Sequence, residues 1–487
     1  MRISDFRLSR TARLRPLVAC LAIALGVEGG SAAAMATAQI SAVLPPSLVD
    51  QAENSPATAL NIAQIDRPRA IFLVQNCDDA GPGSLRDAVA AANMLGTDSA
   101  IQFDLATMGC STITLMTGEI DIVAPNLTIG GPGPEPVSID GGYSLGYTNR
   151  IFRQTVGAGV LHLDHLVLTD AKYITSGNQQ ALGGCIYTLG TAYLSNTRVD
   201  HCVAAAMGSS AYGGGVWGVG VKLIQSVVSN SQALSTSSAS GGGGITAGAG
   251  GLEANDTTVS DNRAASYGVN WGGSGGGVWT DGAAVFQRST ISGNEATFGG
   301  GLFGVHGVAM ANSTVADNKA IRGYGAMRVD ALVSLYNTTV AFNEAYEVSR
   351  LGGVVAASTY ARSSLLANNV TWSAGGVVES DVKSNDGIVS GSHNFIKAAN
   401  VGTTVPMDTL AGCPRIAPLF NNGGPTFTVA LLPYSPAIDF GYDPYDTTDQ
   451  RGPGFERLVG ANVDIGAFEW SDDSGEVINR SGFELCE

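Results

Sequence analysis

The sequence predicts an all-β protein, a right-handed parallel β-helix with an N-terminal capping helix. Glycine accounts for 65 of the 487 residues and charged residues for only 14%. These glycines lack the three-residue period of collagen. The chain also repeats itself at a near-constant spacing, which is typical of solenoids. Many short strands joined by glycine turns fit both observations.

Residues 1–38 have the composition of a secretory signal peptide. Five arginines precede an apolar run from Leu17 to Val27, and Ala36-Thr37-Ala38 follows as a small-residue cleavage site. We expect cleavage near Ala38 and a secreted or cell-surface protein. The apolar run is too short to cross a bilayer, and we expect no transmembrane segment in the mature chain. Residues 39–69 are small, polar and proline-containing, which predicts a flexible segment.

The net charge of −16 argues against nucleic acid and anionic lipid as partners, because both attract a basic surface. A polyanionic substrate such as pectate is also disfavoured unless calcium bridges the two. The oligomeric state stays open.

Repeats over residues 151–400 predict the coils of the β-helix. Seven segments align without gaps on an apolar anchor at intervals of 24 to 32 residues, and the longer intervals carry inserts such as 169–183 and 231–251. Two residues before each anchor stands a Ser or Thr that strand alternation turns inward. Three residues after it we predict a ladder of asparagines at a left-handed corner. The anchors are Val199, Val228, Val259, Ile291, Val315, Val340 and Leu365, and the ladder residues are Asn262, Asn294, Asn318, Asn343 and Asn368.

A charged residue follows the ladder position in four successive coils, and its sign alternates. Arg263, Glu295, Lys319 and Glu344 would each lie between opposite charges when the coils stack. Exposed pairs of this kind are worth only about 0–1 kcal/mol each, so the column favours a structural role in coil register. A catalytic or calcium site would instead group carboxylates.

The two ends of the solenoid need caps. Ser84-Leu85-Arg86-Asp87 opens a predicted helix that Gly96 ends, within an N-terminal cap and first coils at 70–150. Residues 401–470 form a predicted C-terminal module, and 471–487 an acidic linker and tail.

Both end units resemble known modules of bacterial surface proteins. Cys77 to Ala88 resembles the CSLREA N-terminal unit, with Asp87 in place of its glutamate. Asn422-Gly423-Gly424-Pro425, Ser435-Pro436-Ala437-Ile438-Asp439 and Asp464-Ile465-Gly466-Ala467-Phe468-Glu469 resemble the choice-of-anchor Q module. The coils are similar to polymorphic outer-membrane protein repeats. The resemblance implies a pectin-lyase-like fold at the cell surface and, for most members, no defined chemistry.

Six cysteines remain after the predicted cleavage, and an even number in an oxidising compartment indicates disulfides. Cys77 and Cys110 flank one N-terminal unit, and Cys185 and Cys202 lie within one coil. Pairing them in this way leaves Cys413 with Cys486.

Two features predict binding. Alternation turns an interrupted column of aromatic residues outward. These residues form a platform for sugar rings, or they pack between coils, or the 231–251 loop covers them. Four aspartates in the C-terminal module offer oxygen ligands for calcium, although turn chemistry explains them equally well. The aromatic candidates are Tyr187, Trp217, Trp279 and Phe303, and the aspartates are Asp443, Asp446, Asp449 and Asp464.

No catalytic residue is assigned. Leu161-His162-Leu163-Asp164-His165 is only faintly similar to the Trp-Ile-Asp-His strand of pectate lyases, and the pattern that would supply their basic arginine does not follow it. We therefore expect a surface protein that binds extracellular glycan or matrix, with no cofactor except possible calcium. The alternatives are a polysaccharide lyase or glycoside hydrolase with a divergent site, and a passive structural spacer.

Overall fold

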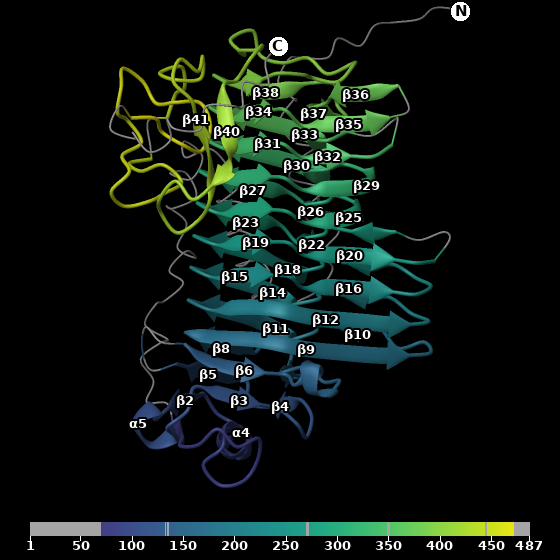
Figure 1. Cartoon of the computed structure of the whole chain (residues 1–487), viewed down its shortest axis with the longest axis vertical. Coiled ribbons are helices and arrows are strands. Elements are labelled where there is room, and N and C mark those ends of the chain that lie inside the picture. Colours follow the sequence, from purple (N-terminus) through teal and green to yellow (C-terminus); the bar gives the residue numbers. More distant parts are fainter. Residues whose placement is uncertain are drawn as a thin grey trace, which may run out of the picture. The chain divides into compact units, whose positions relative to one another are not determined.

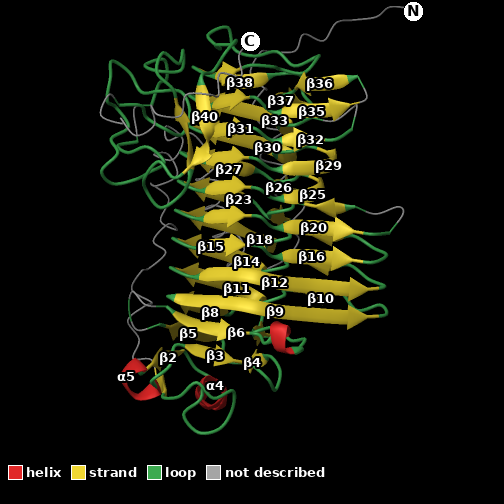
Figure 2. Ribbon diagram, viewed as in Figure 1, coloured by secondary structure: helices red, strands yellow, loops and turns green. Residues whose placement is uncertain are grey.

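The structure is a computed structural model that describes residues 70–471, except 132, 134–135, 269–271, 348–350, 374 and 444–445. The predicted signal peptide, the segment 39–69, Cys486 and the tail lie outside the described residues. The chain forms a parallel β-helix, as predicted, with two long parallel sheets that we call A and B (Figure 1; Figure 2). Among the described residues, no helix has the length and apolar character needed to span a membrane.

The predicted capping helix is present as α4 (Leu85–Leu95). The Ser84 hydroxyl accepts a hydrogen bond from the backbone N–H of Asp87, and Gly96 ends the helix in the left-handed conformation. Leu85, Val89 and Ala92 are buried and belong to the main core. The short helices α5 (Leu105–Met108) and η2 (Tyr143–Leu145) follow, and the predicted disulfide Cys77–Cys110 is formed beside α5.

Each coil contributes strands to both sheets. Pairing between neighbouring coils is parallel, and β35–β36 is an antiparallel hairpin. Sheet A contains β1 (Ala70–Val74), β2 (Ser99–Phe103), β4 (Ile120–Ile122), β5 (Asn126–Gly130), β7 (Phe152–Gln154), β8 (Val160–Asp164), β11 (Ile186–Ser195), β14 (Val216–Ile224), β18 (Ile245–Asn255), β22 (Val278–Thr280), β23 (Ala284–Gln287), β26 (Leu302–Gly304), β27 (Val308–Ala311), β30 (Met327–Tyr336), β33 (Val354–Arg362), β37 (Val382–Ser384) and β38 (Val389–Ser392).

Sheet B covers the other side of the core. Its strands are β3 (Thr112–Thr114), β6 (Val137–Asp140), β9 (Leu166–Ser176), β10 (Ala181–Leu182), β12 (Arg198–Met207), β13 (Ala211–Tyr212), β15 (Val227–Ser229), β16 (Gln232–Ser235), β17 (Ser240–Gly241), β19 (Thr258–Ser260), β20 (Arg263–Ser266), β21 (Gly273–Ser274), β24 (Thr290–Ser292), β25 (Glu295–Phe298), β28 (Thr314–Ala316), β29 (Lys319–Gly323), β31 (Thr339–Ala341), β32 (Glu344–Ala345), β34 (Leu365–Ala367), β35 (Val370–Ser373), β36 (Gly376–Glu379) and β39 (Phe395–Ile396).

Buried asparagines form a continuous column of hydrogen bonds inside sheet B. The side-chain amide of each donates to the side-chain oxygen of the next, from Asn262 through Asn294, Asn318 and Asn343. The next member is Asn369, so the prediction of Asn368 is wrong by one residue. Val340 pairs with Leu366 rather than Leu365, because this coil is one residue longer than the gapless alignment assumed.

The left-handed corner falls one residue before the ladder. Asp261, Gly293, Asp317, Phe342 and Asn368 have positive φ, whereas the ladder asparagines do not. These coils have a second corner with positive φ, where sheet A joins sheet B; Asn312 and Asn337 occupy this corner in successive coils. The side chain at each ladder position therefore points into the core, and its predecessor turns the chain.

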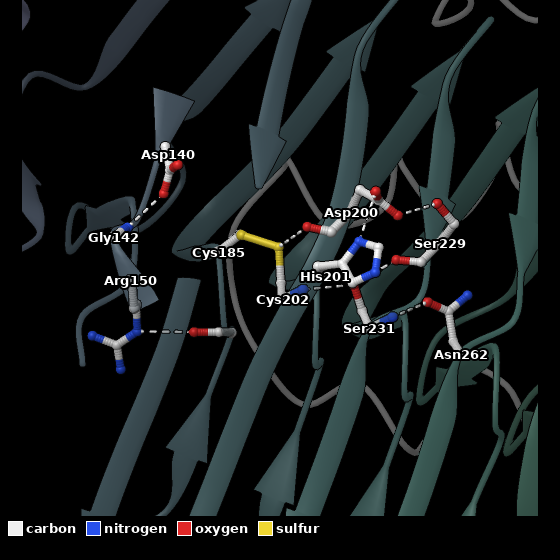
Figure 3. Close-up of a disulfide and its surroundings, with 11 residues drawn as sticks. Asp140, Gly142, Arg150, Cys185, Asp200, His201, Cys202, Ser229, Ser231 and Asn262 are labelled. Atoms are coloured by element: carbon white, nitrogen blue, oxygen red, sulfur yellow. Dashed lines mark hydrogen bonds and ion pairs between the residues drawn. A yellow bond between two sulfur atoms is a disulfide. The ribbon is translucent and has the colours of Figure 1, made fainter. Parts of the chain in front are cut away.

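Glycines are required where the coil narrows opposite the ladder. A Cβ on Gly300 would lie 2.5 Å from the backbone oxygen of Lys319, and one on Gly276 would lie 2.6 Å from backbone atoms of Glu295. A Cβ on Gly301 would meet the amide of Asn318 at 3.0 Å. In an earlier coil the predicted disulfide Cys185–Cys202 takes this place, with Cys202 at the ladder position (Figure 3).

The inserts at 169–183 and 231–251 are regular structure and not the irregular loops that the sequence predicts. Sheet B is extended in the first of these coils, where β9 and β12 are its longest strands and reach further to the right in Figure 1 than its later strands. The return strands β10, β13, β17 and β21 stack in register. Ala181, Ala204, Ala206, Ala211 and Ala233 give this extension a small core of its own.

The C-terminal module packs on the outer face of sheet B. Its hairpin of β40 (Ile416–Phe420) and β41 (Thr428–Leu431) shares a buried cluster with Ala316, Ala341 and Leu365. The buried Gln450 side chain accepts a hydrogen bond from Thr314 at 2.5 Å and donates one to Thr290 at 2.9 Å. The module therefore covers β24, β28, β31 and β34 and leaves the outer ends of β29, β32 and β35 exposed.

Candidate functional site

The four predicted aromatic residues lie in one outward column of sheet A. Tyr187 pairs in register with Trp217, and Trp279 with Phe303; Thr246 separates the two pairs. The neighbouring inward residues, such as Val216 and Leu302, are fully buried, whereas the four aromatic side chains are half-buried.

The faces of these rings are largely occupied by their neighbours. Tyr187 stacks on Trp217 with ring centroids 5.0 Å apart, and the Arg150 guanidinium lies 5.1 Å from the centre of the Tyr187 ring. Tyr212 from the return strand β13 lies 5.8 Å from Trp279, and Arg328 lies 5.4 Å from Phe303. This arrangement favours packing between coils over a sugar platform. Gly241, within the 231–251 segment, lies beside both Tyr212 and Trp279, so this segment and Tyr212 together lie next to the Trp279 ring.

A second aromatic column, on sheet B, is much more exposed. Trp372 in β35 is 42% exposed, and Tyr346, directly after β32, is 41% exposed. Their rings are nearly parallel, with an interplanar angle of 11° and centroids 6.2 Å apart. Ile321 in β29 stands at the equivalent position one coil earlier and is 44% exposed. We call Ile321, Tyr346 and Trp372 the exposed column.

Charged groups border the exposed column. The predicted alternating charges pair in register as Arg263, Glu295, Lys319 and Glu344, and Arg263 contacts Glu295 at 3.1 Å. The Lys319 ammonium lies 4.7 Å from the centre of the Tyr346 ring, and the Tyr346 hydroxyl donates a 2.5 Å hydrogen bond to Glu344. That hydrogen bond, with burial and the Glu344 charge, raises the pKa of Tyr346 to about 12.

Strand parity is the signal that could have found this column in the sequence. Ile321, Tyr346 and Trp372 each stand two residues after the charged column or its continuation at Val370, so alternation places them on the same outer face. The aromatic residues that the sequence predicts to be exposed lie instead on the glycine strands of sheet A.

The four predicted calcium ligands do not converge on one point. Asp443 and Asp446 accept hydrogen bonds from Asn337 and Asn312. Burial and the neighbouring Asp443 raise the pKa of Asp446. Asp443 and Asp446 thus lie together where the module meets the coils.

The other two aspartates have different partners. Asp449 forms a buried bidentate pair with Arg451, and Asp464 accepts backbone N–H groups of Asp439 and Trp470. In the part of the chain that the structure describes, no group of three or more His, Cys, Asp or Glu side chains is arranged to hold a metal ion. Asp449 and Asp464 form hydrogen bonds within the module, whereas Asp443 and Asp446 connect it to the coils.

The His162 to His165 segment forms a polar cluster with the next coil. The Ser195 hydroxyl lies 2.5 Å from Asp164 and 2.8 Å from Nε2 of His162. The Ser195 hydroxyl has one proton and donates it to Asp164, so it can only accept a hydrogen bond from His162. A histidine that activates a serine nucleophile would instead accept the hydroxyl proton. Burial raises the pKa of Asp164, but hydrogen bonds from Ser195, His165 and Asn196 outweigh burial and lower it.

A similar arrangement occurs at a corner of the next coil. Asp200 accepts hydrogen bonds from Ser229 and Asn230, and His201 lies 2.8 Å from its carboxylate (Figure 3). Its occurrence at two different corners of the coil indicates a structural motif that fixes the turn.

Comparison with known proteins gives a fold-level likeness. Among solved structures the chain is similar to the crystal structure of pectate lyase Pel9A, with a TM-score of 0.42 and 14% identity over 83% of this chain and 98% of that chain. No family model and no curated protein matches the chain. A likeness at this level carries no argument about activity, so the parallel β-helix rests on the strand pairing itself.

Proposed function

We propose that this protein is an extracellular binding solenoid whose exposed column holds a glycan without catalysis. The observation that carries the proposal is the nearly parallel, exposed pair Tyr346–Trp372. Aromatic rings offer flat apolar faces, and neighbouring charged groups supply hydrogen bonds to hydroxyls. Lys319 and Glu344 stand in the adjacent column.

The spacing of the coils supports an extended ligand. Equivalent residues on neighbouring parallel strands repeat at roughly 4.8 Å. Ile321, Tyr346 and Trp372 therefore form a strip along the solenoid, which suits a linear polysaccharide better than a single small molecule.

Two observations support an extracellular location. The disulfides Cys77–Cys110 and Cys185–Cys202 are formed, and disulfides persist in oxidising compartments. The predicted signal peptide and the resemblance of both end units to surface-protein modules agree with this location.

Binding to a panel of neutral and acidic polysaccharides, with and without calcium, tests the proposal. We expect the double variant Tyr346→Ala with Trp372→Ala to bind its best glycan at least about tenfold more weakly, since aromatic contacts are worth roughly 1 kcal/mol each. Tyr434→Ala is the matched control, because Tyr434 is 88% exposed in the C-terminal module, away from the column.

Two results would overturn the proposal. Absence of binding across the panel would favour the passive spacer. Reproducible release of unsaturated products or new reducing ends, abolished by substitution of an exposed Asp or Arg, would favour a polysaccharide lyase or hydrolase.

A further inference from the structure

Three reactive side chains meet at the last coil of sheet B. The Lys397 ammonium donates a 3.0 Å hydrogen bond to the side-chain oxygen of Asn368 and also contacts the Glu379 carboxylate. The Lys397 side chain is only 15% exposed. An amine, a carboxamide and a carboxylate therefore share one partly buried corner.

The backbone fixes all three residues. Lys397 directly follows β39, which pairs in register with β34, and its backbone N–H donates to Leu366 at 3.1 Å. Glu379 ends β36 and stands opposite Val370, two residues beyond Asn368. The meeting is set by strand register and does not depend on long side chains alone.

Asn368 is available for this contact because of the one-residue register change. Asn369 takes the ladder position, so Asn368 occupies the left-handed corner with its side chain turned out of the core. Equivalent corners hold Asp317 and Phe342. This asparagine alone among those three has a carboxamide that an amine could attack.

We propose that Lys397 and Asn368 form an intramolecular isopeptide bond with Glu379 as the proton acceptor. Glu379 takes a proton from the Lys397 ammonium, and the freed amine attacks Cγ of Asn368. A bond from Nζ to Cγ forms, the bond from Cγ to Nδ2 breaks, and the leaving nitrogen takes the proton from Glu379. With one further proton from the attacking nitrogen, the leaving group departs as ammonium, and Glu379 is again in its charged form.

No oxidant or cofactor is needed, and atoms and charge balance. Proximity of this kind replaces an encounter between molecules by a reaction within one, which is the main source of its rate. The product would join residues 29 positions apart and tie the last coil to the preceding one. The inference is independent of glycan binding.

Peptide mapping of the full chain after reduction and trypsin digestion tests the bond. We expect residues 363–383 to be joined through Asn368 to a peptide that begins at Ser384, with cleavage at Lys397 blocked and a mass lower by one ammonia. Fragment ions that place the branch at Asn368 and Lys397 would establish it.

Variants separate the roles. Lys397→Arg should restore the two linear peptides, and Glu379→Gln should leave most of the chain unlinked while the fold, followed by circular dichroism, is retained. Lys383→Arg is the control, because Lys383 is exposed on sheet A and should not alter the linkage. Linear peptides with an intact Asn368 in the unaltered protein would overturn the proposal, and full linkage in Glu379→Gln would overturn the role of that carboxylate.

Discussion

At the scale of single residues, Asn318 shows how a polar side chain is accommodated in an apolar core. Its amide donates to Ile291, Ala316 and Asn343, and its oxygen accepts from the backbone and side-chain N–H groups of Asn294. Buried polar groups cost little when every donor and acceptor is paired.

Asn318→Ala would leave partners in two coils unpaired. We expect it to lower the free energy of unfolding by about 3 kcal/mol, since each orphaned buried group costs roughly 1–3 kcal/mol. Chemical denaturation measures the change. Asn385→Ala, at an exposed position, is the control and should stay within about 0.5 kcal/mol of the parent. Equal effects of the two substitutions would contradict the ladder's role in stability.

The ladder was also the most predictable site-level feature, because a repeated residue type at a repeated spacing is visible in the sequence. Its last member was not. Asn368 and Asn369 are adjacent, and only strand register distinguishes the corner residue from the buried one. A gapless alignment carries no information about one extra residue in a coil.

At the scale of elements, the glycine turns show how closely the walls of the coil approach. Gly300 faces the backbone of Lys319 and Gly325 without room for a Cβ. This requirement explains why the glycines recur even where φ is negative.

Gly300→Ala should therefore destabilise the protein by roughly 2–4 kcal/mol, because backbone atoms must move apart. Gly157→Ala is the comparison, since a Cβ there meets nothing within 4 Å. We expect Gly157→Ala to be neutral or stabilising by about 0.5 kcal/mol. Melting temperatures of the two variants measure the contrast, and equal loss in both would show that the close backbone contacts of Gly300 are not the cause.

The extension of sheet B and the aromatic contacts were less predictable. The inserts lack the large apolar residues of the main coils, since alanines form their small core. Strand alternation predicted that Tyr187 and Trp217 point outward. The stacking of their rings depends on side-chain rotamers, and a sequence pattern does not determine these.

At the scale of the whole molecule, buried acids gather towards the C-terminal end. Burial raises the pKa of Asp381 to about 7, that of Asp464 to about 6 and that of Glu469 to about 8. Hydrogen bonds to Asp381 and the Arg457 charge near Asp464 and Glu469 oppose burial without cancelling it.

A pH series should reveal these groups. An acid with a raised pKa in the folded state binds its proton before the unfolded chain does, so stability falls as pH rises from the unfolded to the folded pKa. We expect unfolding by denaturant to require less denaturant at about pH 8.5 than at about pH 5.5, by on the order of 1 kcal/mol or more in free energy. Below about pH 4, acids with lowered pKa such as Asp164 reverse the trend. Stability that rises steadily from pH 5.5 to 8.5 would contradict the assignment.

The sequence did not predict where the C-terminal module packs on the β-helix. Gln450 joins Thr290 and Thr314 across more than a hundred residues. Two of the aspartates that suggested calcium make contacts of the same long range, Asp443 with Asn337 and Asp446 with Asn312. A local sequence pattern shows that several aspartates lie close together in the chain, but it does not show which distant residues they contact.

The asparagine ladder also has a direction. Every side-chain amide donates towards the later coil, so the amide dipoles add head to tail as peptide dipoles do in a helix. The donor end meets the carboxylate of Asp381, which accepts from both the backbone and the side-chain N–H of Asn369. An acid at that end complements the partial positive charge of the array, so the interior of the solenoid has an electrical polarity that its alternating outer charges do not show.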